Sequence, residues 1–164
     1  MNRLPQLVRI GPLVTLLLLT PAIAHAFRYE GAGGKFGMLD AEGSDGAPAV
    51  SAHLEFAHPG TSWHLMPSIM LWDADRMNGL SGNFDLYYHF LPGSAATPYA
   101  GTGVGVNYFD PEGTDDSSTR LGLNLFGGVR FPAGGTRLFV EGRYTASRFT
   151  QVSLLGGITF LGAR

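Results

Sequence analysis

Apolar side chains alternate with small or polar ones over long stretches of the chain after Ala26. In the clearest stretch, Thr119 to Phe131, one face carries three leucines, a valine and a phenylalanine, and the other carries Arg120, Asn124, Phe126 and Arg130. A period of two is the pattern of a strand with one apolar face. These residues are therefore predicted to form a β-strand whose two faces lie in different surroundings.

The same alternation recurs along the rest of this region, clearly in three further stretches and more weakly in four. Strands in soluble domains average about 5 to 6 residues, and these patterns persist for roughly twice that length. No stretch after Ala26 has the periodicity of a helix, which predicts an all-β fold. Eight strands are predicted, over residues 27–39, 48–58, 63–72, 80–91, 98–109, 119–131, 136–147 and 151–160.

The connections between the predicted strands alternate in length. The second, fourth and sixth are short and rich in proline and glycine, whereas the first, third and fifth are mostly longer and acidic. Aromatic residues gather near both ends of the strands. Short turns at one end, long loops at the other and two aromatic girdles are typical of a membrane barrel. We therefore predict an eight-stranded antiparallel up-and-down transmembrane β-barrel, with both termini at the short-turn, periplasmic end.

The N-terminal segment has the pattern of a secretory signal peptide. Arg3 and Arg9 precede an apolar run from Ile10 to Leu19, and two overlapping small-x-small sites follow within residues 22–26. The run is too short for a transmembrane helix, which needs about 20 apolar residues. The sequence predicts a signal peptide over residues 1–26, cleaved before Phe27 or at the earlier site, and a barrel domain over residues 27–164.

Composition excludes several classes of function. The chain has no cysteine, which excludes disulfides, thiolate metal sites and a cysteine nucleophile. Its net charge is -2 and Lys35 is its single lysine, so no basic stripe is present that could neutralise nucleic-acid phosphates. Nucleic acid is therefore not expected as a partner.

Several strings of this sequence resemble a known family. They are PYAGTGVGVNYF (98–109), LGLNLFGGVRF (121–131) and FVEGRY (139–144) followed by VSLLGGITF (152–160). They are similar to the small eight-stranded outer-membrane barrels of the OmpA-, OmpX- and OmpW-like porin family. The resemblance implies a monomer in the cell outer membrane, inserted by the barrel assembly machinery and in contact with outer-membrane lipids and lipopolysaccharide. Its motifs are specific to the fold and bring no catalytic residues with them.

Charged residues on the faces assigned to the lumen are the candidate site. Inside a barrel they must pair with one another or meet water. One hypothesis is a structural charge network that plugs the lumen, and the other is a salt-bridge gate in a narrow pore. The plug is favoured because eight strands leave little open section. The set consists of Glu55, Asp85, Arg120, Arg130, Glu141 and Arg143.

Two register estimates accompany this hypothesis. Pairing counted through a turn at Pro132 to Gly135 places Phe126 close to Glu141 and Arg130 near Arg137. A bulky Phe126 at mid-height favours a blocked section. The glycines of the fifth, sixth and eighth predicted strands, including Gly101-x-Gly103-x-Gly105, are explained by close packing in a tightly curved sheet, since the helix that a phosphate-binding loop requires is missing.

The histidines and loop acids predict no cofactor. His64 and His89 are expected near the periplasmic end on one inward face, but no third zinc ligand is apparent and closed zinc sites take four. The acidic loops do not fit the calcium-loop template, because the segment from Asp73 to Gly79 lacks a ligand and misplaces its glycine. Neither a metal nor another cofactor is predicted.

Catalytic residues are not predicted either. Outer-membrane lipid A deacylases carry a His-x-Ser motif, whereas this chain has His53-x-Glu55 and His64-x-Met66. The leading hypothesis is an integral outer-membrane protein with a structural or surface-interaction role and no catalysis. The alternatives are a narrow channel for small or apolar solutes and a lipid A-modifying enzyme.

Overall fold

The structure is a computed structural model that describes residues 26–41, 46–74, 77–111, 118–148 and 150–162. The predicted signal peptide lies outside these residues, apart from Ala26, and stays a prediction. Most of the acidic residues of the three long connections also lie outside them. Within the described residues, no helix is long and apolar enough to cross a membrane.

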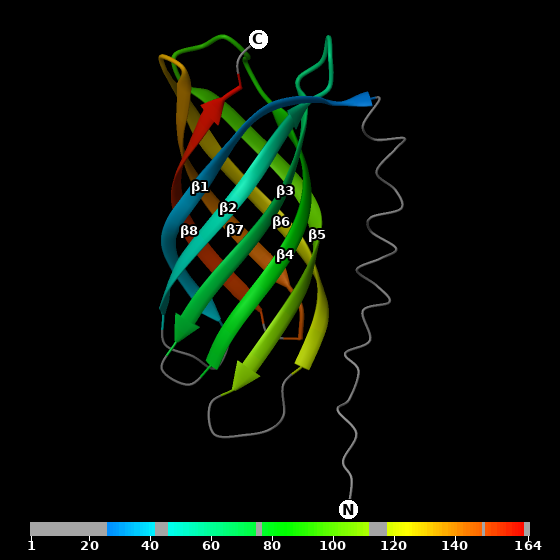
Figure 1. Cartoon of the computed structure of the whole chain (residues 1–164), viewed down its shortest axis with the longest axis vertical. Coiled ribbons are helices and arrows are strands. Elements are labelled where there is room, and N and C mark those ends of the chain that lie inside the picture. Colours follow the sequence, from blue (N-terminus) through cyan, green and yellow to red (C-terminus); the bar gives the residue numbers. More distant parts are fainter. Residues whose placement is uncertain (1–25, 42–45, 75–76, 112–117, 149, 163–164) are drawn as a thin grey trace, which may run out of the picture.

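The described residues form eight antiparallel strands that close into a barrel in the order of the sequence (Figure 1). Each strand pairs with the next, and β8 returns to pair with β1. The strands are β1 (Arg28–Ala41), β2 (Ala47–Ala57), β3 (Trp63–Ala74), β4 (Met77–His89), β5 (Thr97–Pro111), β6 (Ser118–Ala133), β7 (Thr136–Ala146) and β8 (Gln151–Leu161). The predicted eight-stranded antiparallel barrel is confirmed.

The strand ends depart from the predicted ones where backbone pairing outlasts the apolar pattern. β4 begins at Met77 rather than at Leu80, because Asn78 and Gly79 pair with Asp73 and Trp72 of β3. Ladder hydrogen bonds need only backbone groups. Polar residues at the rim therefore continue the strands.

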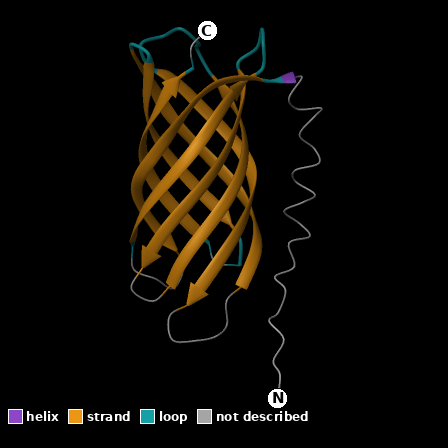
Figure 2. Cartoon of the chain, in the orientation of Figure 1, coloured by secondary structure: helices purple, strands orange, loops and turns teal. Residues whose placement is uncertain are grey.

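The β2–β3, β4–β5 and β6–β7 connections lie at one end of the barrel together with the start of β1 and the C-terminus (Figure 2). Glycines with positive φ angles serve these turns, namely Gly60, Gly93 and Gly134. Glycine adopts this conformation without steric cost. Both described ends of the chain thus lie at the short-turn end, as predicted.

The pairing of β6 with β7 corrects both register estimates. Phe126 pairs with Arg143, and Glu141 pairs with Gly128. Pro132 and Ala133 belong to β6, so the turn contains two residues rather than four and the register moves by two. Arg130 consequently pairs with Phe139, and Arg137 pairs with Pro132.

The two faces of each strand lie where the alternation places them. Leu121, Leu125 and Leu154 are exposed on the outside, whereas Asn124 and Glu141 are buried inside. Apolar residues also fill parts of the lumen. One buried cluster occupies the strand ends that lead into the long connections: Leu39, Ala41, Ala47, Ala49, Met70, Trp72, Phe109 and Leu155. A second lies nearer the short turns and is largely aromatic: Met66, Tyr87, Tyr99, Phe126 and Phe139.

Candidate functional site: ion pairs inside the barrel

Four carboxylates inside the barrel each lie against a cation among the described residues. The pairs are Glu30 with Arg137 (2.7 Å), Glu55 with Arg130, Asp85 with Arg143 (2.7 Å) and Glu141 with Lys35 (2.8 Å). Negative and positive side chains therefore balance one to one. Burying a charge without a partner is costly, so this balance allows the barrel to close around ionised groups.

The centre of the network is Glu141, which is fully buried. Its carboxylate accepts hydrogen bonds from Lys35 Nζ (2.8 Å), Arg143 Nη2 (3.1 Å) and the Tyr99 hydroxyl (3.1 Å). Arg143 also donates to Asp85. These contacts tie β1, β4, β5 and β7 together across the lumen.

Amide and hydroxyl groups extend the network toward the long connections. Asn124 Nδ2 donates to Asn83 Oδ1 (2.9 Å) and to Asp85 Oδ1 (3.1 Å). The Thr145 hydroxyl donates to Asn124 Oδ1 (2.9 Å). Buried polar groups are costly when unpaired, and here they satisfy one another.

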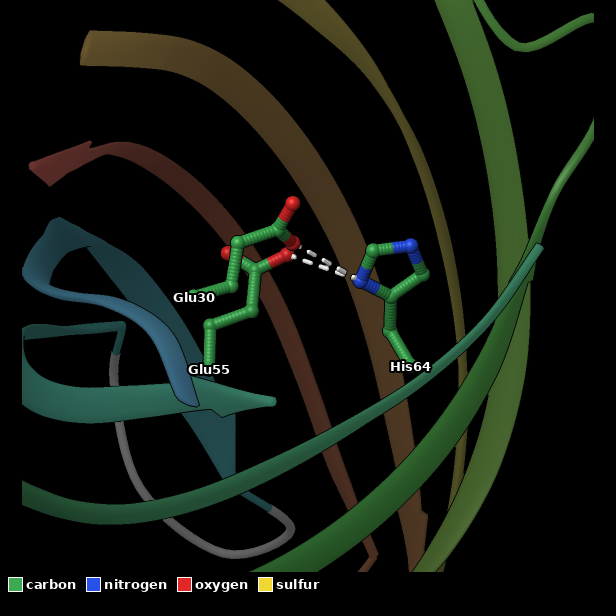
Figure 3. A group of neighbouring side chains, drawn as sticks. All are labelled: Glu30, Glu55 and His64. Carbon is green, nitrogen blue, oxygen red and sulfur yellow. Dashed lines mark ion pairs between the residues drawn. The ribbon is translucent and has the colours of Figure 1, made fainter. Parts of the chain in front are cut away.

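A second group of charges lies nearer the short-turn end. Glu55 accepts hydrogen bonds from Arg130 and from the Tyr87 hydroxyl. His64 Nδ1 lies 3.2 Å from Glu30 Oε2 and 3.3 Å from Glu55 Oε1 (Figure 3). Arg137 approaches both carboxylates from the rim.

Aromatic rings and guanidinium groups fill the remaining section. The guanidinium of Arg130 stacks over Tyr87, Tyr99 and Phe139 at 5.0 to 5.4 Å, and that of Arg143 lies 4.6 Å from the Phe126 ring centre. Cations over aromatic faces are attracted by the ring quadrupole. The guanidinium groups of Arg130 and Arg143 thus pack against aromatic rings inside the lumen.

Glycines provide room for these large side chains. A Cβ at Gly101 would overlap Tyr87 and Phe126, and one at Gly128 would meet the ring of Tyr99. The close packing predicted for these glycines is observed. The strand glycines therefore let neighbouring side chains lie flat against the barrel wall.

Five of the six predicted lumen charges lie in this network: Glu55, Asp85, Arg130, Glu141 and Arg143. Arg120 forms no ion pair with a described residue, although its pairing with the buried Asn107 places it on the inward face of β6. It is half-buried near the start of β6, and its Nη1 donates to the carbonyl of Thr119 at 3.2 Å.

Three charged participants are absent from the predicted set. Lys35 lies in a glycine-rich strand whose alternation is too weak to assign a face. Glu30 lies at an irregularity in the pairing of β1 with β2, between Tyr29 and Gly31, and an irregularity of this kind redirects a side chain. The alternation around Arg137 indicates an inward position, but it does not reveal Glu30 as the partner.

Solved structures of small outer-membrane proteins are similar to this chain over most of its length. Neisserial surface protein A has a TM-score of 0.61 at 17% identity, with 82% of this chain and 96% of that chain covered. A major outer membrane protein from Thermus thermophilus has a TM-score of 0.58 at 13% identity, with coverages of 84% and 100%. This chain has the fold of the small eight-stranded outer-membrane β-barrels. No family model matches it, and no curated protein sequence matches it.

One structure with this outer-membrane barrel fold is described as an enzyme. The outer membrane enzyme PagL has a TM-score of 0.51 at 17% identity, with 78% of this chain and 97% of that chain covered. Similarity at this level concerns the fold alone.

The described histidines of this chain lie away from the lipid-facing side. His53, His64 and His89 are buried in the lumen, and His58 lies at a turn. His53 Nε2 bonds to Thr159 Oγ1 at 2.9 Å.

Proposed function

We propose that this chain is an integral outer-membrane protein with a structural or surface-interaction role and no catalysis. Its own side chains plug the lumen of the barrel. The observation that carries the proposal is the one-to-one pairing of lumen charges around the buried carboxylates of Glu141 and Glu55. A conducting pore keeps charged groups in water, whereas these groups are bonded to protein.

The outer surface supports a location in the membrane. Large apolar side chains project outward from every strand, among them Phe36, Ile69 and Leu154, which are more than half exposed. Exposed apolar surface on this scale requires an apolar partner. Lipid, including lipopolysaccharide at the loop side, is the proposed partner, and a monomer inserted by the barrel assembly machinery is the proposed state.

Electrical recording tests the plug. In planar bilayers the purified protein is expected to show little steady conductance at any salt concentration, because Arg130, Arg143 and the aromatic cluster occupy the section. A steady conductance whose ion selectivity changes in Glu141→Gln would contradict the plug and establish a channel. A large-pore outer-membrane porin in the same bilayers is the positive control.

Gel mobility tests the closed barrel in its membrane. We expect the protein to fractionate with outer membranes and to migrate faster unheated than boiled, because a barrel without free strand edges resists detergent. Recovery as a soluble periplasmic protein, with no mobility shift on heating, would refute the proposed location.

A narrow passage for apolar solutes is a second candidate. The cluster at the long-connection end is apolar, and it includes Leu39, Met70, Trp72 and Phe109. These side chains favour contact with an apolar solute over contact with an ion. The cluster continues into the aromatic and ionic layers, so passage would require those layers to part.

The third candidate, a lipid A-modifying enzyme, requires a catalytic site. A hydrolase of this kind needs a histidine and a nucleophile on the lipid-facing side, and the described histidines do not supply one. This distribution supports the absence of catalysis. Mass analysis of lipid A from cells with and without the protein should show identical species; a lost acyl chain would overturn the proposal.

A further inference from the structure

At the short-turn end of the lumen, where Arg130 Nε and Arg137 Nη1 also lack a partner, four carboxylate and imidazole atoms are buried without a hydrogen-bond partner among the described residues. They are Glu30 Oε2, Glu55 Oε2, His64 Nδ1 and His89 Nε2. His64 and His89 are only 6% and 7% exposed. Each unsatisfied buried group destabilises a fold. Four of them in one place indicate that the cluster has a ligand of its own.

The spacing of three of these residues matches a metal ion. His64 Nδ1 lies 3.2 Å from Glu30 Oε2 and 3.3 Å from Glu55 Oε1 (Figure 3). The plane of the ring does not point Nδ1 well at either oxygen, so His64 forms a hydrogen bond with neither. Ligand atoms around a tetrahedral zinc with bonds of about 2.0 to 2.1 Å lie about 3.3 to 3.4 Å apart. One ligand atom from each residue falls within a group no wider than 4.8 Å.

We propose that Glu30, Glu55 and His64 form a binding site for a divalent metal ion of the zinc class at the periplasmic mouth of the barrel. One imidazole and two carboxylates suit zinc better than magnesium or calcium, which prefer oxygen ligands alone. The ring of His89 lies 4.1 Å from that of His64, centre to centre, and adds a neighbouring nitrogen. This site goes beyond the proposed structural role and is independent of it.

Two arginines share the carboxylates with the proposed ion. Arg137 bonds Glu30 Oε1 and leaves Glu30 Oε2, the oxygen 3.2 Å from His64 Nδ1, without a hydrogen-bond partner. Glu55 Oε1 already contacts Arg130, Arg137 and the Tyr87 hydroxyl, so Glu55 would bind the ion by turning its free Oε2 toward it. Arg130 is buried, but the Arg137 side chain is 21% exposed at the rim and has room to turn toward water. Both arginines oppose a bound cation, and Arg137, at the rim, is the one that can be replaced without removing the buried Arg130–Glu55 pair, which makes it a diagnostic position.

Protons compete with the ion for the same atoms. A zinc-bound imidazole must be neutral and a zinc-bound carboxylate ionised. A protonated His64 would instead donate toward Glu30 and Glu55. Zinc binding is thus expected to weaken as the pH falls.

Calorimetric titration with Zn²⁺ alone tests the site. The full-length chain is purified in detergent without a histidine tag and treated with a chelator before titration. The wild type is expected to bind about one zinc ion, and His64→Asn and Glu30→Gln are each expected to weaken binding about tenfold or more. Mg²⁺ at the same concentration should not compete.

Three variants show whether zinc binds at this cluster or elsewhere on the chain. His53→Asn removes a buried lumen histidine bonded to Thr159, and His58→Asn removes a half-buried one at a turn; both should bind zinc as the wild type does. Arg137→Gln should bind zinc more tightly, because it removes one of the two competing cations. A purely structural ion-pair cluster would not produce this gain.

Stability provides the second measurement. Zinc should raise the melting temperature of the wild type but not that of His64→Asn, since a ligand that binds the native state stabilises it. Gel mobility before and after heating identifies any variant that has failed to fold.

The proposal is overturned if the wild type does not bind zinc, if His64→Asn binds zinc equally well, or if binding is lost only in His58→Asn. None of these outcomes affects the conductance test of the plug.

Discussion

Replacing Glu141 with glutamine is expected to destabilise the barrel by about 3 to 5 kcal/mol. The carboxylate is fully buried and lies 2.8 Å from Lys35 Nζ and 3.1 Å from Arg143 Nη2. The amide has nearly the same shape, so the loss is one of charge rather than volume. Lys35 would remain buried without its carboxylate. Denaturant unfolding of the protein in lipid vesicles, followed by tryptophan fluorescence, measures the change.

A double-variant cycle identifies the cause. Glu141→Gln combined with Lys35→Met should cost less than the two single changes added, because no unpaired charge remains. Asp40→Asn, an exposed acid on β1, is the matched control and should change stability by less than about 0.5 kcal/mol. Equal effects of Glu141→Gln and Asp40→Asn would show that the network contributes nothing.

Placing an arginine at Leu125 is expected to cost about 2 to 4 kcal/mol, the penalty for a cation on the lipid face at the bilayer midplane. Leu125 lies near the middle of β6, points outward and is 52% exposed. Its neighbours Thr102 and Tyr144 belong to the adjacent strands. The same unfolding measurement in vesicles tests this substitution.

The control at this position is Leu125→Phe, which remains apolar and should be close to neutral. Thr119→Arg provides a depth control, since Thr119 is exposed at the start of β6. The penalty for arginine falls toward about 0 to 1 kcal/mol near the interface. A Leu125→Arg variant that is as stable as Thr119→Arg would contradict the membrane assignment of this face.

The faces of the strands follow from the sequence because side chains alternate across a strand with a fixed period of two. The positions of Leu125 outside and Asn124 inside need no tertiary information. The lengths of the connections likewise predict the order of the strands, since short turns force neighbours in sequence to pair. Fold class, strand number and the inward position of Glu141 and Arg143 were therefore all predictable.

The register of β6 with β7 shows where such prediction ends. Pro132 and Ala133 read as turn residues, yet they continue the strand, and Gly134 alone adopts the positive φ angle of the turn. A difference of two residues preserves every face, so the hydrophobic pattern cannot detect it. It does change the residues of the neighbouring strand with which Glu141 and Arg130 pair.

Contacts across the lumen were decided only by the tertiary structure. Arg130 of β6 meets Glu55 of β2, and Arg137 of β7 meets Glu30 of β1. These pairs depend on the closure of β1 against β8, on the irregularity beside Glu30 and on the direction of long side chains. Alternation determines which side of the wall a residue occupies. Only the closed barrel, by bringing opposite walls within reach of one another, determines which residues meet in its centre.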